Sequence, residues 1–421
     1  MEHLEIANPI GPLNKGLGPM ERALMPGQAA SLNWNLLRED LSLPCAILYR
    51  DRLLNNQQWM RRFIESYGVK IAPHGKTTMA PQLFHMQLQG GAWGITMATA
   101  QQTRVGYEHG VRRILMANQL IGRQNMAIVA QLLRDPGFTF YCLVDSADGV
   151  DALGAWFAPI DVRVNVLIEL GVMGGRAGVR NEAQLAALLE ALDRCKQTVC
   201  LSGVEIYEGV LDDEASIRAF LRRACDVTAQ LLAEKRFAQS PPILTGAGSA
   251  WFDVVAEEFT SAAFPEPVEI VLRPGCYLTH DVGSYLKAHA RMVQSNPMAR
   301  QMGEGLLPAL HIWAYVQSIP EPQRAIIGMG RRDAAFDSGL PVPALHFRPG
   351  SPAPKQAPAH WETAKLMDQH AYMQFEPGDD LLVGDMIGFD ICHPCLTFDK
   401  WRAISVVDSA FSIVDVLQTY F

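Results

Sequence analysis

One lysine in this sequence has surroundings that suit covalent chemistry. Lys76 follows the apolar run 69–72 and the segment Pro73-His74-Gly75, and two threonines come directly after it. An apolar run interrupted by proline and glycine predicts a buried strand that ends just before the lysine. Burial disfavours an ammonium group, so Lys76 is a candidate Schiff-base nucleophile. The alternative is a solvated loop lysine, which is the usual role of this residue type.

Two later segments carry glycine and hydroxyl groups where strands are expected to end. Thr245-Gly246-Ala247-Gly248-Ser249 follows one apolar run, and Gly275 with Tyr277 follows the next. Glycine lets backbone N–H groups approach an anion, and a helix N-terminus adds its dipole, so both turns suit a phosphate group. Most turns of this kind bind nothing. A lysine and a phosphate cradle in one barrel mouth nevertheless indicate pyridoxal phosphate (PLP), with Lys76 as the residue that carries it.

Three further residues are expected beside the same cofactor. His74 precedes the lysine, Arg176 lies beyond the apolar run 162–169, and Tyr207 ends the run 201–207. In a parallel barrel, catalytic groups come from the carboxyl ends of the strands and from the loops that follow them. The sequence therefore predicts that His74, Arg176 and Tyr207 belong to the cofactor site.

The second cluster of reactive side chains lies in the segment Asp390-Ile391-Cys392-His393-Pro394-Cys395. His393 and Cys395 present a nitrogen and a sulfur ligand in one turn, as a zinc site requires. The alternative is a buried cysteine pair beside a structural histidine, because zinc sites built from two protein ligands are uncommon. The other histidines lack ligand spacing and are expected to be structural. Acidic candidates for further ligands are Asp281, Asp385 and Asp390.

The composition describes an ordinary globular enzyme. The 421 residues are 49% hydrophobic and 19% charged, and the net charge of −8 gives no reason to expect nucleic acid or an anionic membrane as a partner. The N-terminus has acidic residues and no long apolar stretch, and no segment approaches the length of a membrane span. Eight irregularly spaced cysteines do not form a disulfide framework, so a reducing cytoplasm is the expected setting.

Strand-like and helix-like segments alternate from residue 43 to about residue 290, and this rhythm predicts parallel βαβ units. About eight units without a dinucleotide-binding fingerprint favour an α/β fold with a (β/α)8 TIM-like barrel over residues 43–290. Residues 291–421 are expected to form a smaller β-rich domain, with strands at 310–317, 324–328, 380–387 and 404–407 and a proline-rich loop at 347–358. Residues 1–42 are expected to be an extension that packs on this domain, with a short helix near residues 20–24.

Four motifs together resemble the D-serine dehydratase and D-threonine aldolase family, whose members have an alanine racemase-like fold. They occur in the family's order and cover roughly residues 43–410. The motifs are Pro73-His74-Gly75-Lys76-Thr77, the glycine-rich segment 245–249, Arg273-Pro274-Gly275-Cys276-Tyr277 with Asp281, and Gly384-Asp385 with His393 and Cys395.

The resemblance implies a PLP-binding barrel with a C-terminal β domain, a homodimer with active sites near the subunit interface, and a small D-amino acid as substrate. Lys76 would carry PLP, and His393 with Cys395 would hold a divalent metal. Cys395 stands where the aldolases tend to have aspartate, and a thiolate suits zinc better than manganese. The expected enzyme is a zinc-dependent dehydratase, or ammonia-lyase, that converts D-serine, D-threonine or 3-hydroxy-D-aspartate to a 2-oxo acid and ammonia. In this scheme the freed lysine removes the Cα proton and the metal assists departure of the β-hydroxyl.

Three alternatives stay open. They are retro-aldol cleavage to glycine and an aldehyde on the same site, racemisation, and a non-catalytic PLP carrier, which the C-terminal domain disfavours. The chain also departs from the family pattern. The segment from Glu169 to Arg176 is two residues longer than its family counterpart, and Thr78-Met79 replace the pattern expected after Thr77. These departures suggest a subgroup whose substrate need not be D-serine.

Overall fold

The barrel is one eight-stranded parallel sheet in the computed structural model, which describes residues 8–303 and 305–421. Its strands follow the order β2-β9-β8-β7-β6-β5-β4-β3. The two ends of the sheet meet where the Thr96 N–H donates to the Pro73 carbonyl at 2.8 Å and His74 forms a parallel bridge with Thr96. The prediction of a (β/α)8 barrel is therefore confirmed. The strands are β2 (Lys70–Ile71), β3 (Ile95–Met97), β4 (Arg113–Gln119), β5 (Thr139–Val144), β6 (Val164–Leu170), β7 (Val199–Ile206), β8 (Ile243–Gly246) and β9 (Glu269–Leu272).

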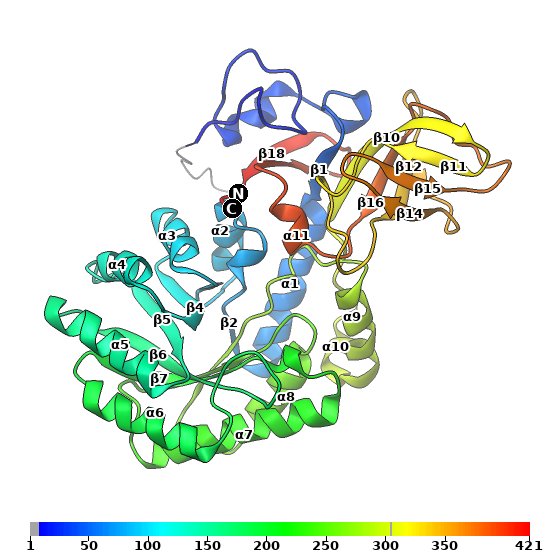
Figure 1. Cartoon of the computed structure of the whole chain (residues 1–421). Coiled ribbons are helices and arrows are strands. Elements are labelled where there is room, and N and C mark those ends of the chain that lie inside the picture. The colour runs from blue at the N-terminus through cyan, green and yellow to red at the C-terminus, as the bar shows by residue number, and fades with distance from the viewer. Residues whose placement is uncertain (1–7, 304) are drawn as a thin grey trace.

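Helices alternate with these strands and cover the outside of the sheet (Figure 1). The longest helix, α7, shows why they do so. The Asp213 side chain caps its start by accepting from the Ser216 N–H, and its buried apolar residues recur three or four positions apart, which is the spacing of one helix face. The helices are α1 (Arg50–Tyr67), α2 (Pro81–Gln89), α3 (Ala100–Glu108), α4 (Arg123–Leu132), α5 (Ala147–Phe157), α6 (Glu182–Cys195), α7 (Glu214–Ala233) and α8 (Phe252–Ser261).

The second sheet is mostly antiparallel and lies beside the barrel (Figure 1). Strand β1 begins the α/β rhythm in the sequence, yet it pairs with β10 and β17 in this sheet. The extension packs on the same sheet, with Ile10, Leu17 and Trp34 in one apolar cluster with Trp313. The strands are β1 (Cys45–Tyr49), β10 (Leu310–Glu321), β11 (Arg324–Ile327), β12 (Val342–Phe347), β13 (Lys355–Gln356), β14 (Glu362–Leu366), β15 (Ala371–Gln374), β16 (Met386–Asp390), β17 (Ala403–Val407) and β18 (Ile413–Gln418).

Two predicted elements are wrong in place or kind. No helix forms at residues 20–24, because the Leu24 backbone exchanges two 2.8 Å hydrogen bonds with Ile10; a 3-10 helix follows at Pro26–Leu32. The strand expected at 380–387 begins only at Met386, because the Asp385 carboxylate accepts from the Leu382 N–H at 2.9 Å and closes a turn before it. Helix α5 was not predicted, because its two internal glycines weaken its helical pattern.

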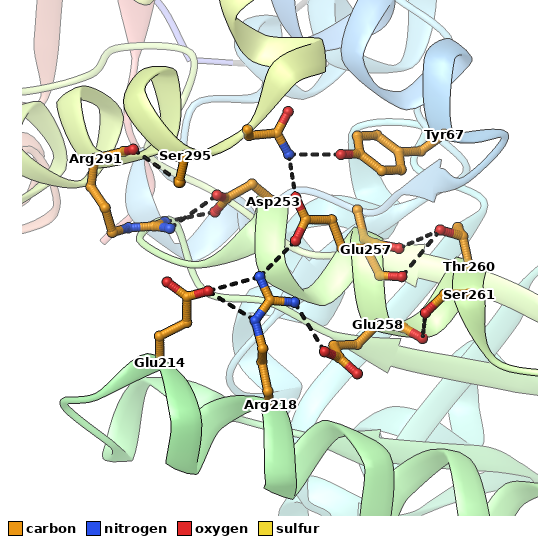
Figure 2. Close-up of polar contacts among 12 residues, drawn as sticks. Tyr67, Glu214, Arg218, Asp253, Glu257, Glu258, Thr260, Ser261, Arg291 and Ser295 are labelled. Carbon is orange, nitrogen blue, oxygen red and sulfur yellow. Dashed lines mark hydrogen bonds and ion pairs between the residues drawn. The ribbon is translucent and has the colours of Figure 1, made fainter.

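Polar side chains join the helices on the outer face of the barrel (Figure 2). Arg218 of α7 donates to Glu214 on its own helix at 2.8 Å and to Glu257 and Glu258 of α8 at 2.7 and 2.9 Å. We call these four residues the Arg218 cluster. Every nitrogen of the Arg218 guanidinium has a carboxylate partner, so Arg218 needs no ligand to complete its hydrogen bonds.

Helix α9 (Ser284–Ser295) and helix α10 (Pro297–Gln301) connect the barrel to the second sheet. Arg291 of α9 holds Asp253 of α8 with bonds of 2.7 and 3.0 Å, drawn in Figure 2. These bonds hold α9 against α8. Within the described residues, no helix is long and apolar enough to cross a membrane.

Candidate active site

A cavity of about 260 Å³ lies at the carboxyl ends of the barrel strands and reaches the loop that follows β16. This volume is close to the lower end of the range for small-molecule sites. The cavity brings together residues that the sequence analysis selected from both domains. Those that line it are His74, Lys76, Arg176, Tyr207, Gly248, Ser249, Gly275, His393 and Cys395.

Lys76 lies in a 3-10 turn, Gly75–Thr77, directly after β2. Gly75 lets this turn sit against β3, since a Cβ there would lie 2.7 Å from Ile95 Cγ2. Lys76 itself is exposed within the cavity wall. The burial expected from the sequence is therefore wrong. The lysine stands free to react with a molecule that enters the cavity.

His74 lines the same wall as a neutral ring. Burial lowers the pKa of its imidazole well below the usual value, and the nearby Arg273 and Lys76 charges act in the same direction. Its Nδ1 atom is buried without a hydrogen-bond partner in the described chain. An unpaired buried polar atom costs about 1–3 kcal/mol, so this atom is poised to pair with a ligand.

The floor of the cavity contains a buried ion pair that the sequence analysis did not assign. Arg273 follows β9, and Glu205 is the last but one residue of β7. Both side chains are 1% exposed, and Arg273 Nη2 donates to Glu205 Oε1. Burial raises the pKa of Glu205 to about 7, although the Arg273 charge opposes this shift. Glu205 Oε2 and Arg273 Nε have no partner in the part of the chain that the structure describes. A charged residue inside an apolar strand was the available signal for Glu205.

Thr245 supports this pair and does not line the cavity. Its hydroxyl donates to the Val271 carbonyl at 2.7 Å and accepts from Arg273 Nη1 at 2.8 Å. Gly246 is also outside the lining, because it packs against Ile206 and Phe259. These two predicted cofactor residues therefore lie beneath the site.

The glycine-rich loop binds an oxyanion that belongs to the chain itself. The Ala247 and Gly248 N–H groups donate to the Glu208 carboxylate at 3.1 and 2.6 Å. Ser249 turns to the neighbouring loop, where its Oγ accepts from the Gly275 and Cys276 N–H groups at 3.1 Å each. Glu208 therefore occupies two of the N–H groups that the sequence assigned to a phosphate. Glu208 was missed because no motif marks it.

Arg176 and Tyr207 form another part of the wall. The Arg176 guanidinium lies 4.9 Å from the centre of the Tyr207 ring and 3.7 Å from Glu169. Burial raises the pKa of Glu169, and the Arg176 charge partly offsets that effect. The longer loop after β6 therefore still brings Arg176 to the cavity.

The two tyrosines near β9 lie differently from the sequence expectation. Tyr277 is buried in a small apolar pocket with His280 and Met292 and does not line the main cavity. Tyr285, at the start of α9, lines both spaces. The Cys276 thiol beside Tyr285 raises the pKa of its hydroxyl, with burial acting in the same direction. Tyr285 was missed because it lies on helix α9, away from the strand ends, and no motif marks it.

Two sulfur atoms meet at the opposite wall. Cys276 Sγ and Cys395 Sγ are 3.7 Å apart, and Thr77 Oγ1 lies 3.5 Å from Cys395 Sγ. The hydrogen bond from Cys276 and the one from His393 lower the pKa of the Cys395 thiol and favour a thiolate there. The same contact raises the pKa of Cys276. Cys276 was not predicted as a site residue.

His393 is oriented by a carboxylate that the sequence analysis did not consider. Its Nδ1 lies 2.7 Å from Asp337 Oδ2, and the contacts with Cys395 and Asp337 raise the pKa of the ring to about 9. No motif identifies Asp337, which lies in the loop before β12. A histidine held by a carboxylate through one nitrogen presents the other nitrogen as a ligand.

The acidic residues suggested by the sequence have other partners. Asp385 holds Arg348 and His346, Asp390 lies 2.7 Å from His311, and Asp281 accepts from the backbone at the start of α9. Across the described residues, no three His, Cys, Asp or Glu side chains are already gathered around one metal position. The donor set at this wall, one imidazole and two sulfurs, is nonetheless typical of zinc.

Two family models divide the chain between them. The model for the alanine racemase N-terminal domain matches residues 48–263, and a model for a serine dehydratase domain matches residues 309–407. The first match covers more than half of the 421 residues. The chain belongs to the alanine racemase N-terminal domain family.

Two characterised proteins have sequences similar to this chain. A D-threonine aldolase from Arthrobacter sp. is 25% identical over 329 residues, which are 77% of this chain and 77% of that protein. A D-threo-3-hydroxyaspartate dehydratase from Delftia sp. (strain HT23) is 28% identical over 214 residues, 50% of this chain and 55% of that protein. The chain is thus close to both an aldolase and a dehydratase family.

Two solved structures share the fold of this chain. A D-threonine aldolase from Filomicrobium marinum superposes with a TM-score of 0.75 at 23% identity and covers 92% of this chain and 97% of its own. The Delftia dehydratase superposes with a TM-score of 0.68 at 20% identity, over 92% of this chain and 99% of its own. These likenesses establish the fold.

PLP is the cofactor expected of this family, and the cavity residues fit it. Three buried polar atoms there lack partners among the described residues: His74 Nδ1, Glu205 Oε2 and Arg273 Nε. A ring that carries a nitrogen and a phenolic oxygen would supply such partners. Gly275 brings its loop close to the turn that carries Lys76, since a Cβ on Gly275 would lie 2.5 Å from His74 Cβ. We therefore find no steric or polar obstacle to PLP in these residues.

Proposed function

We propose that this chain is a PLP- and divalent-metal-dependent lyase that converts a D-β-hydroxy amino acid to a 2-oxo acid and ammonia, with zinc as the metal. One observation carries the proposal: Lys76 from the barrel and the pair His393 and Cys395 from the second domain line a single cavity. A covalent nucleophile and a metal-ligand pair facing one small space match an elimination in which a hydroxyl group must leave.

Different residues around the cavity would hold different parts of PLP. Lys76 would carry it, Ser249 and Gly275 would lie at its phosphate, and His74, Arg176 and Tyr207 would surround its ring. Bound there, PLP supplies a conjugated ring that accepts electron density from the Cα of an attached amino acid. His393 and Cys395 would hold the metal, which supplies a Lewis acid for the β-hydroxyl.

In this reaction one side chain of the protein would move a proton, and the other groups around the cavity would keep their charges. Lys76 Nζ, once free, takes the Cα proton, because it is the amine exposed in the cavity. His74 stays neutral and offers Nδ1 as a hydrogen-bonding atom. The buried pair Arg273 and Glu205 keeps a fixed dipole under the site, so no side chain has to reorganise as charge develops.

Retro-aldol cleavage to glycine and an aldehyde is a second candidate for the same site. The similarity to the Arthrobacter D-threonine aldolase, which spans 77% of both proteins, favours it. The sulfur ligand favours the dehydratase, because Cys395 stands where the aldolases of the resembled family tend to have aspartate and a thiolate suits zinc better than manganese. The two reactions break different bonds, so their products distinguish them.

Product analysis tests the proposal. The purified protein is incubated with D-serine, D-threonine and 3-hydroxy-D-aspartate, with and without a chelator, and ammonia, 2-oxo acid, glycine and aldehyde are measured. We expect ammonia and 2-oxo acid in equal amounts and a loss of both after chelation, restored by zinc. Glycine and aldehyde would support the aldolase instead. Turnover that a chelator leaves unchanged would contradict the metal dependence of either reaction.

A further inference from the structure

We propose that Cys276 is a third protein ligand of the divalent metal, so that the ion is held by Cys276, Cys395 and His393. The inference rests on the proposed function, because it concerns the metal of that same site. It adds a ligand from the barrel to the pair contributed by the second domain.

The spacing of the two sulfurs carries the proposal. Cys276 Sγ and Cys395 Sγ are 3.7 Å apart. Tetrahedral zinc with Zn–S bonds of about 2.3 Å separates two sulfur ligands by roughly 3.8 Å. Thr77 Oγ1, which lies 3.5 Å from one sulfur and 3.9 Å from the other, packs on the same pair. The sulfurs therefore already stand at the distance that one zinc ion requires.

The histidine is oriented for the same ion. Asp337 holds His393 through Nδ1 at 2.7 Å, which leaves Nε2 for a metal. No three-ligand set is already closed in the described part of the chain, so binding must draw the His393 ring towards the sulfur pair. His393 and Cys276 both line the cavity, so both side chains face the same space.

A third ligand changes what the site can do. Three protein ligands and one open position are the usual arrangement of catalytic zinc, and the open position lies where a substrate oxygen can enter. Two thiolates also select zinc over manganese more strongly than one. Because Cys276 follows β9 and Cys395 follows β16, the ion would join the barrel to the second domain.

X-ray absorption at the zinc edge tests the ligand set directly. The zinc-loaded holoenzyme is measured under a phosphine reductant, which keeps both thiols reduced, and the sulfur neighbours near 2.3 Å are counted. We expect two sulfurs per zinc in the native chain and one in Cys276→Ser. We also expect zinc affinity in Cys276→Ser, measured by competition with a chromophoric chelator, to fall by about 100-fold.

Cys392→Ser is the matched control. Cys392 lies in the same loop as Cys395, but its thiol donates to the Leu340 carbonyl at 3.2 Å, a role that a serine hydroxyl can keep. This variant should retain two sulfurs per zinc and native affinity. If Cys276→Ser fails to fold, Cys276→Ala takes its place in the same measurement, and one sulfur per zinc in the native chain overturns the proposal without any variant.

The possible results distinguish an error in the Cys276 assignment from an error in the proposed metal-dependent lyase activity. One sulfur per zinc in the native chain, unchanged in Cys276→Ser, overturns the role of Cys276 and leaves the metal-dependent lyase intact. A native chain that binds no zinc overturns both. Two sulfurs that persist in Cys276→Ser overturn the assignment of the second sulfur to Cys276.

Discussion

Two arginines in this barrel hold carboxylates in very different ways. In the Arg218 cluster each nitrogen of the guanidinium has a carboxylate partner, and Arg218 is 27% exposed. Arg273 is 1% exposed, and its Nε and the Oε2 of its partner Glu205 have no partner in the described chain. The first cluster joins helices α7 and α8 and needs nothing more. The second leaves polar atoms unpaired beside a cavity, which is the mark of a site that a ligand completes.

The largest effect expected at the cavity follows from Lys76→Ala. We expect turnover to fall by at least about 10⁴-fold, because the variant lacks both the nucleophile and the base. Thermal stability should hardly change, since Lys76 is exposed. Lys70→Ala is the matched control. Lys70 lies on β2, the strand before the turn that carries Lys76, and it pairs with Glu269 away from the cavity. Steady-state kinetics on both variants measure the effect, and equal losses would contradict the role of Lys76.

The fold and the cavity were predictable to different degrees. Alternating apolar runs predicted the barrel, because helix and strand periods are local properties of the sequence. The pairing of β1 with β10 and β17 joins residues far apart in the chain, and no local pattern reports it. Lys76, His393 and Cys395 were predicted because motifs mark them. Asp337 and Glu208 act through contacts that only the fold creates, so no local pattern indicates them.

The second prediction concerns stability and compares the two arginines. Arg273→Ala leaves Glu205 buried without its partner, and removing one member of a buried pair costs about 3–5 kcal/mol. Chemical denaturation of the cofactor-free protein measures this loss. A cost below about 1 kcal/mol would show that Glu205 is protonated and needs no cation.

The third prediction is a pH dependence. Burial raises the pKa of Glu205 from its ordinary 4.5 to about 7, with Arg273 opposing and Glu169 adding to the shift. A carboxyl group with a raised pKa binds a proton on folding, so its stabilisation is complete below pH 4.5 and is lost as the pH rises through about 7. We expect the native chain to lose more thermal stability than Glu205→Gln between pH 5 and 8. If thermal stability falls equally with pH in the two proteins, the pH dependence does not come from Glu205.

The smallest effect is expected in the Arg218 cluster. Arg218→Ala should cost about 1 kcal/mol, because ion pairs of partly exposed side chains contribute roughly 0–1 kcal/mol each and the freed carboxylates can reach water. Its effect should shrink further in 1 M salt, where exposed charges are screened. Denaturation at low and high salt measures both. Turnover should stay native, and a large loss of activity would show that this cluster is coupled to the cavity.

The most direct test of the central claim is to locate the lysine that carries PLP. The holoenzyme is reduced with borohydride and digested, and the pyridoxyl-modified peptide is identified by mass spectrometry. We predict a single modification on Lys76. A modification on Lys70 or another lysine, or none after loading with PLP, would contradict the assignment of the cavity as the site of chemistry.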